Sequence, residues 1–376
     1  MKIIHIAPFY YPVIGGVQEV VKRVAEYMAS KGYNVYVVTY SRAMIGGIGS
    51  LPREEVINNV RVIRLKPDFI WSYGTYGSEL PEVLKKLKPD LVHVHVWRHP
   101  HVFQVIKLKR KLCFKTILHG HAPFYRLSQL GIVTWFYHRA VDLLLKSTLR
   151  KYDKLIALTP YEKNILVRKL GVEAERVIVI PNGIDDKFFN LALSAGKTET
   201  NVVLYLGRIS KEKNLNLLAK AMTHVKKSIP NVRLVIAGPD QGLITKLERY
   251  MQKHGINFLY MGTVSEHEKC KLYSECTIYA NPALYEGFGI TLLEAQAFGK
   301  PCIITGEGGQ LYAAPPGMTS LRAEPNPKDF AKAILTLLTD KQLYEKLSTN
   351  AKFWASQHVW SRILPKYEEV YNQLCG

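Results

Sequence analysis

The chain has 376 residues, of which 47% are hydrophobic and 22% are charged, and its formal net charge is +20. This composition excludes a disordered chain, and the length suits about two domains. The sequence carries neither zinc-finger spacing nor an RNA-binding signature. We therefore expect no nucleic acid partner, and the positive charge predicts some other anionic partner.

No apolar run reaches the ~18 residues that a membrane-spanning helix needs. The first residues, Lys2–Pro8, predict a strand and not a signal peptide. Five cysteines without metal-ligand spacing indicate a reduced protein. We therefore expect a cytoplasmic location.

Alternating strand and helix patterns run through the chain and predict an α/β fold with parallel sheets covered on both faces. In the first half, strands are expected at Ile3–Ala7, Asn34–Thr39, Val60–Leu65, Leu91–Val96, Phe114–Leu118, Lys154–Leu158 and Val177–Ile180. Helical patterns run from Val17 up to Gly32 and at about 78–88, 99–111, 131–151 and 160–170.

A polar stretch from Asn190 to Thr200 lacks a core pattern and predicts a linker. A second series of strands follows at Val203–Leu206, Arg233–Ala237, Asn257–Tyr260, Cys276–Ala280 and Pro301–Thr305. Its helices are expected at about 214–227, 290–298, 327–340, 341–357 and from Trp360 onward.

The loop between the first strand and the first helix ends in Gly15-Gly16. In doubly wound sheets, ligands bind at the carboxyl ends of the strands, where this loop lies. The loop is not a G-x-G-x-x-G dinucleotide fingerprint, and a lone Gly-Gly pair is a weak signal by itself.

Six histidines lie close together in the sequence, so a metal site has to be considered. They are His93, His95, His99, His101, His119 and His121. His93 and His95 share one face of a strand, but no nearby carboxylate or cysteine completes a ligand set and the six need not converge. We therefore expect no metal. His119 ends a predicted strand before Gly120, so it is preferred over His121 as a side chain that projects into a ligand-binding cleft.

In the second half, a strand leads into Gly207-Arg208 and then into Lys213-Asn214 at the start of a helix. An arginine binds phosphate through two parallel hydrogen bonds, and a lysine supplies a point charge. The spacing predicts a phosphate-binding pair, although isolated charges in a loop are more often simply solvated.

The stretch from Asn281 to Pro301 combines a buried strand, a glycine-rich turn and a new helix. The turn Gly287-Phe288-Gly289 lets the backbone approach a ligand, and the helix directs unpaired N–H groups and its positive dipole end at that point. Two carboxylates, Glu286 and Glu294, are separated by seven residues. Such a site suits a polar, partly anionic small molecule.

These motifs resemble those of the retaining nucleotide-sugar glycosyltransferases of family 4. The resemblance extends over the first loop, Thr-x-x-His-Gly at His119, Pro-Asn-Gly-Ile-Asp from Pro181, Gly-Arg-x4-Lys-Asn and Glu-x7-Glu. It implies the GT-B architecture, in which two doubly wound Rossmann-like domains face a cleft. Residues 1–188 would form the acceptor-side domain and 189–359 the donor domain, with a terminal helix at 360–376 packed back on the first.

The resemblance implies a role for each candidate residue. Arg208 and Lys213 would bind the diphosphate, Glu286 and His119 the donor sugar, and Glu294 the ribose. Other donor contacts would come from Gly15, Gly16, Gly207, Val264, Phe288, Gly289, Ile290 and Thr291.

The chain departs from the family pattern in two loops. Pro282-Ala283 replaces the usual Pro-Ser before the Glu-x7-Glu motif, so one hydroxyl contact is missing. The loop Gly306–Gln310 lacks the usual acid of Gly-Gly-x-x-Glu, which places its ligand contacts in doubt.

The expected reaction moves a hexose (mannose, glucose or N-acetylhexosamine) from a UDP- or GDP-sugar to a hydroxyl acceptor with retained configuration. No cofactor and no metal are expected, because the sequence contains no Asp-x-Asp. Two alternatives remain: a UDP-sugar 2-epimerase on the same architecture, and a non-catalytic basic binding protein.

Residues 101–150 carry nine lysines and arginines against one acid. A basic run from Lys107 to Lys111 precedes a helical pattern with an apolar stripe, whose members are Val133, Phe136, Tyr137, Val141, Leu144 and Leu145. A helix with an apolar face and basic flanks can lie in a lipid interface. We expect a lipid-linked acceptor and peripheral attachment to the inner face of an anionic membrane; the alternative is that the stripe packs on the sheet.

Overall fold

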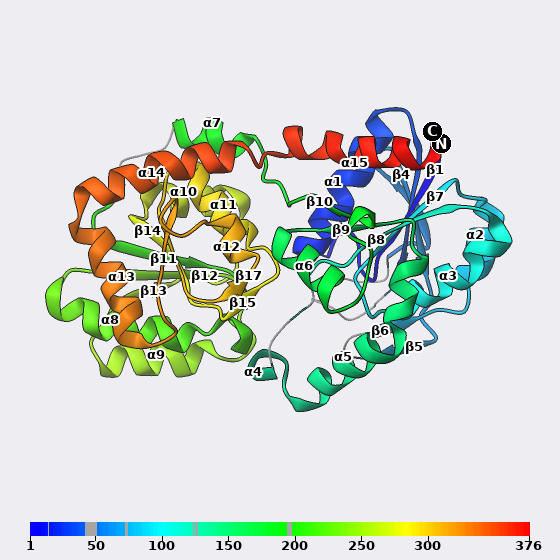
Figure 1. Ribbon diagram of the computed structural model, residues 1–376. Helices are drawn as coiled ribbons and strands as arrows, with labels where there is room; N and C mark the ends of the chain where they lie inside the picture. Colours follow the sequence, from blue (N-terminus) through cyan, green and yellow to red (C-terminus); the bar gives the residue numbers. More distant parts are fainter. Residues whose placement is uncertain (14, 42–50, 72–73, 123, 125–126, 194–197) are drawn as a thin grey trace. The chain divides into compact units, whose positions relative to one another are not determined.

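The computed structural model describes residues 1–13, 15–41, 51–71, 74–122, 124, 127–193 and 198–376. The chain divides into two compact units. Unit 1 comprises Met1–Phe124, Ile132–Asn182 and Ser361–Gly376, and unit 2 comprises Tyr125–Gly131 and Gly183–Trp360. Each unit is an α/β body built on its own parallel sheet (Figure 1).

The boundary between the units falls at Asn182 and not at residue 188, where the sequence analysis expected the first domain to end. A Cβ atom on Gly183 would lie 2.7 Å from the ring of Trp360, and Ile184 forms a parallel bridge with Val359. The chain is therefore packed against other unit 2 residues from Gly183 onward. The short insertion of residues 125–131 in unit 2 has no signal in the sequence.

Unit 1 contains an eight-stranded sheet among the described residues, in the order β10-β9-β8-β7-β1-β2-β4-β3. All neighbouring strands are parallel except β3 and β4. The strands are β1 Lys2–Ile6, β2 Asn34–Tyr40, β3 Glu54–Ile57, β4 Val60–Leu65, β7 Leu91–His95, β8 Lys115–His119, β9 Lys154–Ala157 and β10 Val177–Val179, and a separate hairpin pairs β5 Phe69–Trp71 with β6 Gly74–Tyr76.

Helices cover both faces of this sheet (Figure 1). Alternate residues of each strand point to opposite faces, so Ile4 and Ile6 pack with α2 and α3 while His5 points to the other side. On that other side α15 lies beside α1, and the Tyr27 hydroxyl of α1 donates a hydrogen bond to Glu368 at 2.9 Å. The helices are α1 Gly16–Ser30, α2 Leu80–Leu87, α3 Pro100–Leu112, α5 Ile132–Leu145, α6 Pro160–Arg168 and α15 Trp360–Cys375, with 3-10 turns at Lys146–Lys151 and Ala174–Arg176.

Unit 2 contains a six-stranded parallel sheet among the described residues, in the order β13-β12-β11-β14-β16-β18. The order reverses between β11 and β14, as in a doubly wound nucleotide-binding sheet. The strands are β11 Val202–Leu206, β12 Arg233–Ala237, β13 Asn257–Tyr260, β14 Ile278–Asn281, β16 Cys302–Ile304 and β18 Ser320–Arg322, and two short strands, β15 Tyr285–Glu286 and β17 Glu307–Gly308, pair outside the main sheet.

Two helical layers enclose the unit 2 sheet, with α8, α9 and α13 on one face and α10, α11 and α14 on the other (Figure 1). Apolar side chains of α8 and α13 fill the first layer, and Met222 and Phe330 there are fully buried. The helices are α4 Leu127–Leu130, α7 Lys187–Leu193, α8 Leu215–Ser228, α9 Ile244–Lys253, α10 Glu266–Glu275, α11 Ile290–Ala297, α12 Gln310–Ala313, α13 Pro327–Thr339 and α14 Lys341–Ser356, with a 3-10 turn, η3, at Lys211–Lys213.

Two expected elements differ from the structure. The linker expected from Asn190 begins inside α7, where Phe188 is buried and contacts Phe298; residues 194–197 of that linker lie outside the described residues. The single helix expected at 131–151 ends at Leu145 and continues as a 3-10 turn. Within the described residues, no helix combines the length and hydropathy that crossing a bilayer requires.

Candidate active site

The carboxyl ends of the unit 2 strands bring together the loops that carry the Gly-Arg-x4-Lys-Asn and Glu-x7-Glu motifs. The first motif follows β11 and the second follows β14, and these strands are neighbours at the point where strand order reverses. Chains leave adjacent strands in opposite directions at such a point, which opens a crevice between their loops. The candidate site is built around this crevice within unit 2.

Three glycines let the backbones at these strand ends approach one another. The amide of Gly207 donates to the carbonyl of Ala237 at 2.9 Å, and the amide of Gly238 donates to that of Gly262 at 2.7 Å. A Cβ atom on Gly238 would lie only 2.0 Å from the Gly207 carbonyl oxygen, so this position tolerates no side chain. Gly207 belongs to a recognisable sequence motif, whereas Gly238 does not, because a single glycine after a strand has no distinctive spacing.

Arg208 follows Gly207 and keeps a largely exposed side chain. Its guanidinium lies 3.5 Å from the carboxylate of Glu212, and the Arg208 side chain is 54% exposed. The Tyr205 hydroxyl donates to the Arg208 carbonyl at 2.8 Å and fixes the backbone from which the side chain projects. Arg208 is therefore anchored at its backbone and weakly held at its charged end.

Lys213 and Glu286 form the closest ion pair of the site. The Lys213 Nζ atom lies 2.6 Å from Glu286 Oε1, and the two side chains are only 18% and 13% exposed. Asn281, the last residue of β14, directs its amide at the same carboxylate oxygen from 3.4 Å. The structure thus brings together two residues that are 73 positions apart in the sequence.

Gln129 of the inserted segment ties the backbones behind this ion pair. Its side-chain amide donates to the Tyr285 carbonyl at 3.1 Å and lies 3.3 Å from the Glu212 carbonyl. These carbonyls belong to the residues directly before Glu286 and Lys213. Gln129 is therefore a positioning residue for both, and the sequence analysis missed it because its partners are far away in the chain.

The helix α11 begins at Ile290, directly after Gly289. Gly289 adopts φ 92°, a left-handed conformation that favours glycine. The first-turn amides, including those of Ile290 and Thr291, have no intrahelical acceptor and carry the positive end of the helix dipole. The Tyr279 hydroxyl lies 2.8 Å from Thr291 Oγ1 and 2.8 Å from the Leu206 carbonyl, which links this helix start to the end of β11.

Glu294 lies on the second turn of α11 and is buried with both carboxylate oxygens occupied. Its Oε1 accepts a bond from Lys269 at 2.9 Å and its Oε2 accepts one from the Tyr273 hydroxyl at 2.8 Å. Burial alone would lower the pKa of Lys269, but the negative charges of Glu294 and Glu266 outweigh it and raise that pKa. Lys269 and Tyr273 hold the carboxylate in one orientation; neither was identified from the sequence.

The loop that lacks the expected acid has a structural role. Gly308 and Gly309 pack on the backbone of residues 286–288, and a Cβ atom on Gly309 would lie 2.1 Å from the Gly287 carbonyl oxygen. The amide of Gly309 donates to the Glu286 carbonyl at 2.7 Å. Gln310 is fully buried, and its side chain donates to the Ala283 carbonyl at 3.0 Å. This loop holds the segment that carries Glu286.

The remaining predicted donor contacts of unit 2 lie near the same strand ends. Val264 follows Gly262 at the end of β13 and is half-buried, whereas Phe288 is 4% exposed and its ring centroid lies 6.2 Å from that of Tyr312. At Phe288 the backbone, and not the buried ring, is therefore the part of the residue available for contact.

Three of the predicted site residues, Gly15, Gly16 and His119, belong to unit 1. Gly15 caps α1 in an extended conformation, and Gly16 is the first residue of that helix. His119, at the end of β8, is fully buried, whereas His121 is half-buried in the following loop. The preference for His119 as the sugar contact stays a prediction, and its ring has no exposed surface in this structure.

The histidines converge more than the sequence analysis expected. His93, His95, His119 and His121 come together with His5, which was not considered, whereas His99 and His101 lie at the start of α3. The reason is the register of the sheet, in which His5 lies opposite His93 and His95 lies opposite His119.

Two Rossmann-like units, one of them carrying a lysine–carboxylate pair beside a glycine-capped helix start, define the GT-B class of glycosyltransferases. Residues 189–354 match the family model described as glycosyl transferases group 1, and residues 14–188 match that of glycosyltransferase family 4. Together these matches cover most of the chain. The chain belongs to glycosyltransferase family 4.

Curated relatives match this chain over nearly its full length. One subunit of the phosphatidylinositol N-acetylglucosaminyltransferase of Arabidopsis thaliana is 23% identical over 99% of this chain and 82% of its own. A GDP-mannose:cellobiosyl-diphosphopolyprenol alpha-mannosyltransferase of Komagataeibacter xylinus is 24% identical over 100% and 94%.

Two solved structures share the fold. Sucrose-phosphate synthase from Thermosynechococcus elongatus superposes with a TM-score of 0.80 at 22% identity, covering 99% of this chain and 98% of that one. Anabaena Alr3699/HepE in complex with UDP-glucose gives 0.75 at 17% identity, covering 99% and 100%.

Replacing Gln129 with alanine removes the amide that holds the backbones before Glu286 and Lys213. Losing one or two such hydrogen bonds is expected to lower kcat/KM for sugar transfer about 3- to 10-fold, with at most a small fall in the melting temperature. Gln252→Ala, at an exposed position on α9, is the matched control. Equal activity of the two variants would show that Gln129 does not position the pair.

Proposed function

We propose that this protein transfers a hexose from a UDP- or GDP-sugar to a hydroxyl acceptor with retention of the anomeric configuration. The observation that carries the proposal is the 2.6 Å pair of Lys213 and Glu286 beside Arg208 and the start of α11. It combines positive groups suited to a diphosphate with a carboxylate suited to sugar hydroxyls in one small region of unit 2.

The positive groups match the charge that develops during transfer. As the sugar becomes oxocarbenium-like, negative charge grows on the leaving diphosphate. Lys213 supplies a point charge, Arg208 is free enough to close on phosphate oxygens, and the α11 amides add fixed dipoles. Fixed groups of this kind stabilise the leaving charge without having to reorganise during the reaction.

The two glutamates have different surroundings that suit different parts of the donor. Glu286 is held on one oxygen by Lys213 and Asn281, which leaves Oε2 for a sugar hydroxyl. Glu294 lies on the second turn of α11, fixed by Lys269 and Tyr273, and its remaining lone pairs suit ribose hydroxyls. We assign Glu286 to holding the sugar and not to nucleophilic attack.

Arg208→Ala and Lys213→Ala are each expected to lower kcat/KM about 10²–10³-fold, the loss that follows removal of one preorganised donor in other enzymes. The measurement is steady-state transfer with a saturating acceptor. Lys211→Ala removes an exposed lysine of the same turn and is the matched control. A loss below tenfold for both variants would contradict their role at the diphosphate.

Transfer is expected to proceed at an unchanged rate when excess EDTA is present in the assay. The positive charge needed at the diphosphate comes from Arg208, Lys213 and backbone amides, and the chain contains no Asp-x-Asp to hold Mg²⁺ or Mn²⁺. Loss of activity in EDTA that Mg²⁺ or Mn²⁺ restores would contradict this prediction.

The donor base and sugar are proposed only as a class. The Anabaena neighbour is described with UDP-glucose, and the Komagataeibacter relative is described as using GDP-mannose. A panel of UDP- and GDP-sugars, followed by mass spectrometry of the products, identifies the donor. Incubation without acceptor distinguishes transfer from 2-epimerisation, because an epimerase converts the donor sugar and needs no acceptor.

For the acceptor we propose a lipid-linked hydroxyl at an anionic membrane surface, and α5 supports this proposal. Tyr137 and Val141 turn toward the rest of unit 1, whereas an exposed apolar face points away from it. On that face Val133 is 84% exposed and Leu144 is 73% exposed. The face consists of Ile132, Val133, Phe136, Leu143 and Leu144. The stripe expected from the sequence is thus split between a packed side and an exposed side.

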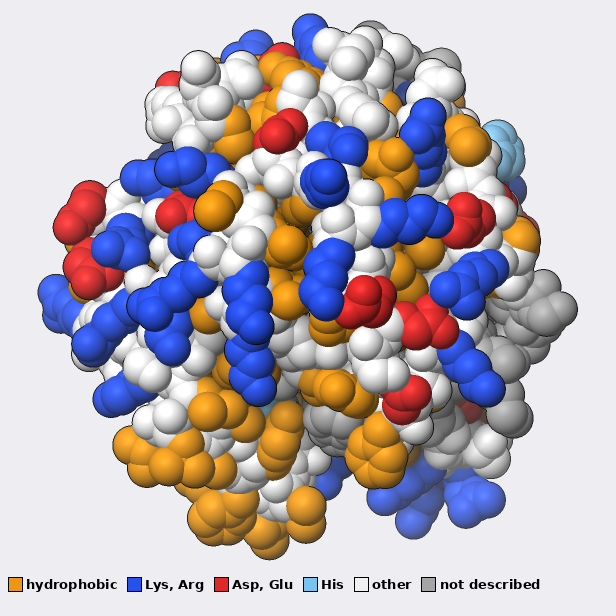
Figure 2. Space-filling view, turned by 90° about the vertical axis from the view of Figure 1, so that its right-hand side faces the viewer, with side chains coloured by type: hydrophobic (Ala, Val, Ile, Leu, Met, Phe, Trp, Pro, Cys, Tyr) orange, Lys and Arg blue, Asp and Glu red, His pale blue; other side chains and the backbone are white. Residues whose placement is uncertain are grey.

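Basic side chains accompany this apolar face. In Figure 2, hydrophobic side chains gather along the lower edge of the molecule, below a broad area of lysines and arginines. Lys107, Arg110 and Lys111 of α3 are exposed, whereas Lys109 is bound to Asp153 at 2.8 Å and is unsuited to lipid contact. An apolar face with exposed cations beside it is typical of a helix that lies in an anionic lipid interface.

A cavity of about 320 Å³ between α3 and α5 adds to this argument. It is an open pocket with apolar walls from Phe103, Tyr137, Val141 and Leu145, and Arg98 and Lys107 also line it. An apolar cavity with a cation beside it suits the chain and the phosphate of a lipid. The relatives named for phosphatidylinositol and diphosphopolyprenol substrates are consistent with such an acceptor.

The protein is expected to sediment with vesicles that contain anionic lipid, and binding is expected to weaken as salt rises. Each basic residue at such a surface contributes about 1 kcal/mol, so changing Lys107, Arg110 and Lys111 to glutamate should weaken binding at least about 100-fold. The matched control changes three exposed lysines of unit 2, Lys220, Lys227 and Lys253, to glutamate. Equal recovery of the wild-type protein in the supernatant with and without anionic vesicles at low salt would exclude this acceptor surface.

A further inference from the structure

Five histidines lie within one buried cluster of unit 1, on the face of the sheet that α15 covers. The β1 residue His5 is the register partner of His93, and His95 is the register partner of His119. His121 follows in the loop after β8 and stacks on His119, with ring centroids 3.8 Å apart. The first four are fully buried.

Hydrogen bonds within the described residues leave several of these ring nitrogens without a partner. They are Nε2 of His5, Nε2 of His93 and both nitrogens of His119. A buried polar group without a partner costs about 1–3 kcal/mol. Of these nitrogens, Nε2 of His93 is the one considered as a ligand atom in the group of three histidines described next.

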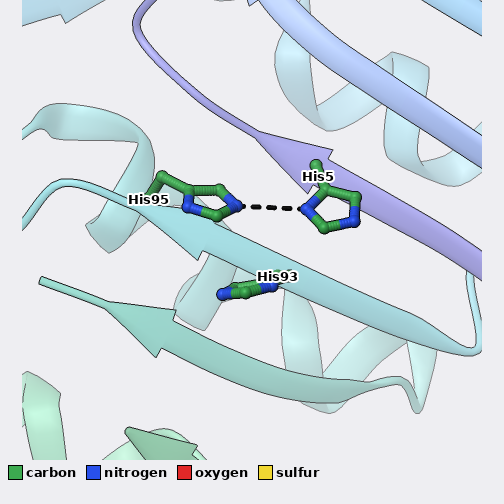
Figure 3. A group of neighbouring side chains, drawn as sticks. All are labelled: His5, His93 and His95. Carbon is green, nitrogen blue, oxygen red and sulfur yellow. Dashed lines mark hydrogen bonds between the residues drawn. The ribbon is translucent and has the colours of Figure 1, made fainter. Parts of the chain in front are cut away.

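Three of the histidines have the geometry of metal ligands. One ligand nitrogen from each of His5, His93 and His95 lies within 4.8 Å of the others. The Nδ1 atom of His5 is 3.1 Å from Nε2 of His95, and Figure 3 shows the His93 ring beside this pair. Two nitrogens bound tetrahedrally to zinc at about 2.0–2.1 Å are about 3.3 Å apart, close to the separation seen here.

We propose that His5, His93 and His95 bind one Zn²⁺ ion. The ligand atoms are Nδ1 of His5, Nε2 of His95 and the unpartnered Nε2 of His93. A water molecule or hydroxide completes four-coordinate geometry, as in other zinc sites with three protein ligands.

In two of the proposed ligands, His93 and His95, the ring nitrogen that would not bind zinc already has a hydrogen-bonding neighbour. His93 Nδ1 lies 2.5 Å from the Tyr371 hydroxyl, and His95 Nδ1 lies 3.0 Å from Nε2 of His121. In metal sites the second ring nitrogen usually donates a hydrogen bond, which fixes the tautomer and aims the ligand. Tyr371 and His121 supply acceptors at these two positions.

The donor set selects the kind of metal. Three uncharged imidazoles offer no oxygen ligand to Mg²⁺ or Ca²⁺, which prefer carboxylates and carbonyls, and imidazole suits zinc. Burial lowers the pKa of His5 to about 3 and holds those of His93 and His95 well below the usual value, so their unprotonated ligand form is present at neutral pH.

A second group, His95, His119 and His121, also has nitrogens close enough to share an ion. It shares His95 with the first group, and its His121 lies in a loop with φ 59°, not on a strand. The ligands of the first group all stand on β1 and β7, whose backbones hydrogen-bond directly to each other. Rigid ligands lose less freedom on binding, which favours the first group.

Zinc at this position would connect β1 to β7 and, through Tyr371, to α15. The proposal concerns unit 1 and is independent of the sugar transfer proposed above. An EDTA-resistant transfer reaction is compatible with this zinc site. All three zinc ligands are fully buried, and the residues proposed to bind the diphosphate, Arg208 and Lys213, belong to unit 2.

The test uses the full-length protein expressed in zinc-supplemented medium and washed with EDTA. Elemental analysis is expected to find about one zinc ion per chain, and X-ray absorption at the zinc edge is expected to find nitrogen ligands at about 2.0–2.1 Å. His93→Gln should abolish retention of the metal. Tyr371→Phe should keep it but yield it to a competing chelator about 10–100-fold more readily, a readout that remains if His93→Gln does not fold.

Two controls define the site. His119→Gln alters the second group only and should retain zinc, as should His267→Gln, which removes an exposed histidine of α10. Zinc lost in His119→Gln but retained in His93→Gln would overturn the proposal in favour of the second group. Wild-type protein without bound zinc, or zinc lost in His267→Gln alone, would overturn it altogether.

Discussion

The reversal of strand order between β11 and β14 is the constraint on which the candidate site depends. Both strands are central and parallel, so the loops at their carboxyl ends emerge side by side and diverge. The crevice between them receives the start of α11 and the turn that carries Lys213. Neither loop contains the site alone; it arises from their adjacency, which the sheet enforces.

Within that crevice, the Lys213–Glu286 pair depends on a framework of backbone contacts. Glu286 lies on a short strand that pairs with β17, and glycines of the β17 loop approach it so closely that a side chain would clash. Gln129 and Gln310 hold the same segment through the carbonyls of Tyr285 and Ala283, which both precede Glu286. The Lys213–Glu286 pair is thus surrounded by uncharged groups that hold its backbone in place.

Unit 1 has the same kind of topology, but different side chains lie at its reversal. Its strand order reverses between β1 and β7, and this is where His5 and His93 face one another beneath α15. Helix α5 instead leaves an apolar face uncovered. Unit 1 therefore combines a local cluster of buried histidines, set beside a large apolar core, with an apolar exterior face. Buried polar clusters and exposed apolar faces are both departures from ordinary packing.

The sequence by itself determined the α/β class and most long elements, because these depend on periodicity and short spacings, but it missed the helices α9 and α10. The resemblance of its motifs indicated the family and the donor loops. Local patterns carry no information on contacts between distant residues. Only the tertiary structure therefore decided that Lys213 meets Glu286, that Lys269 and Tyr273 hold Glu294, and that Gln129 reaches both loops. The same limit applies to the histidines: strand register, a long-range property, brings His5 beside His93 and within hydrogen-bonding distance of His95, which is 90 positions away in the sequence.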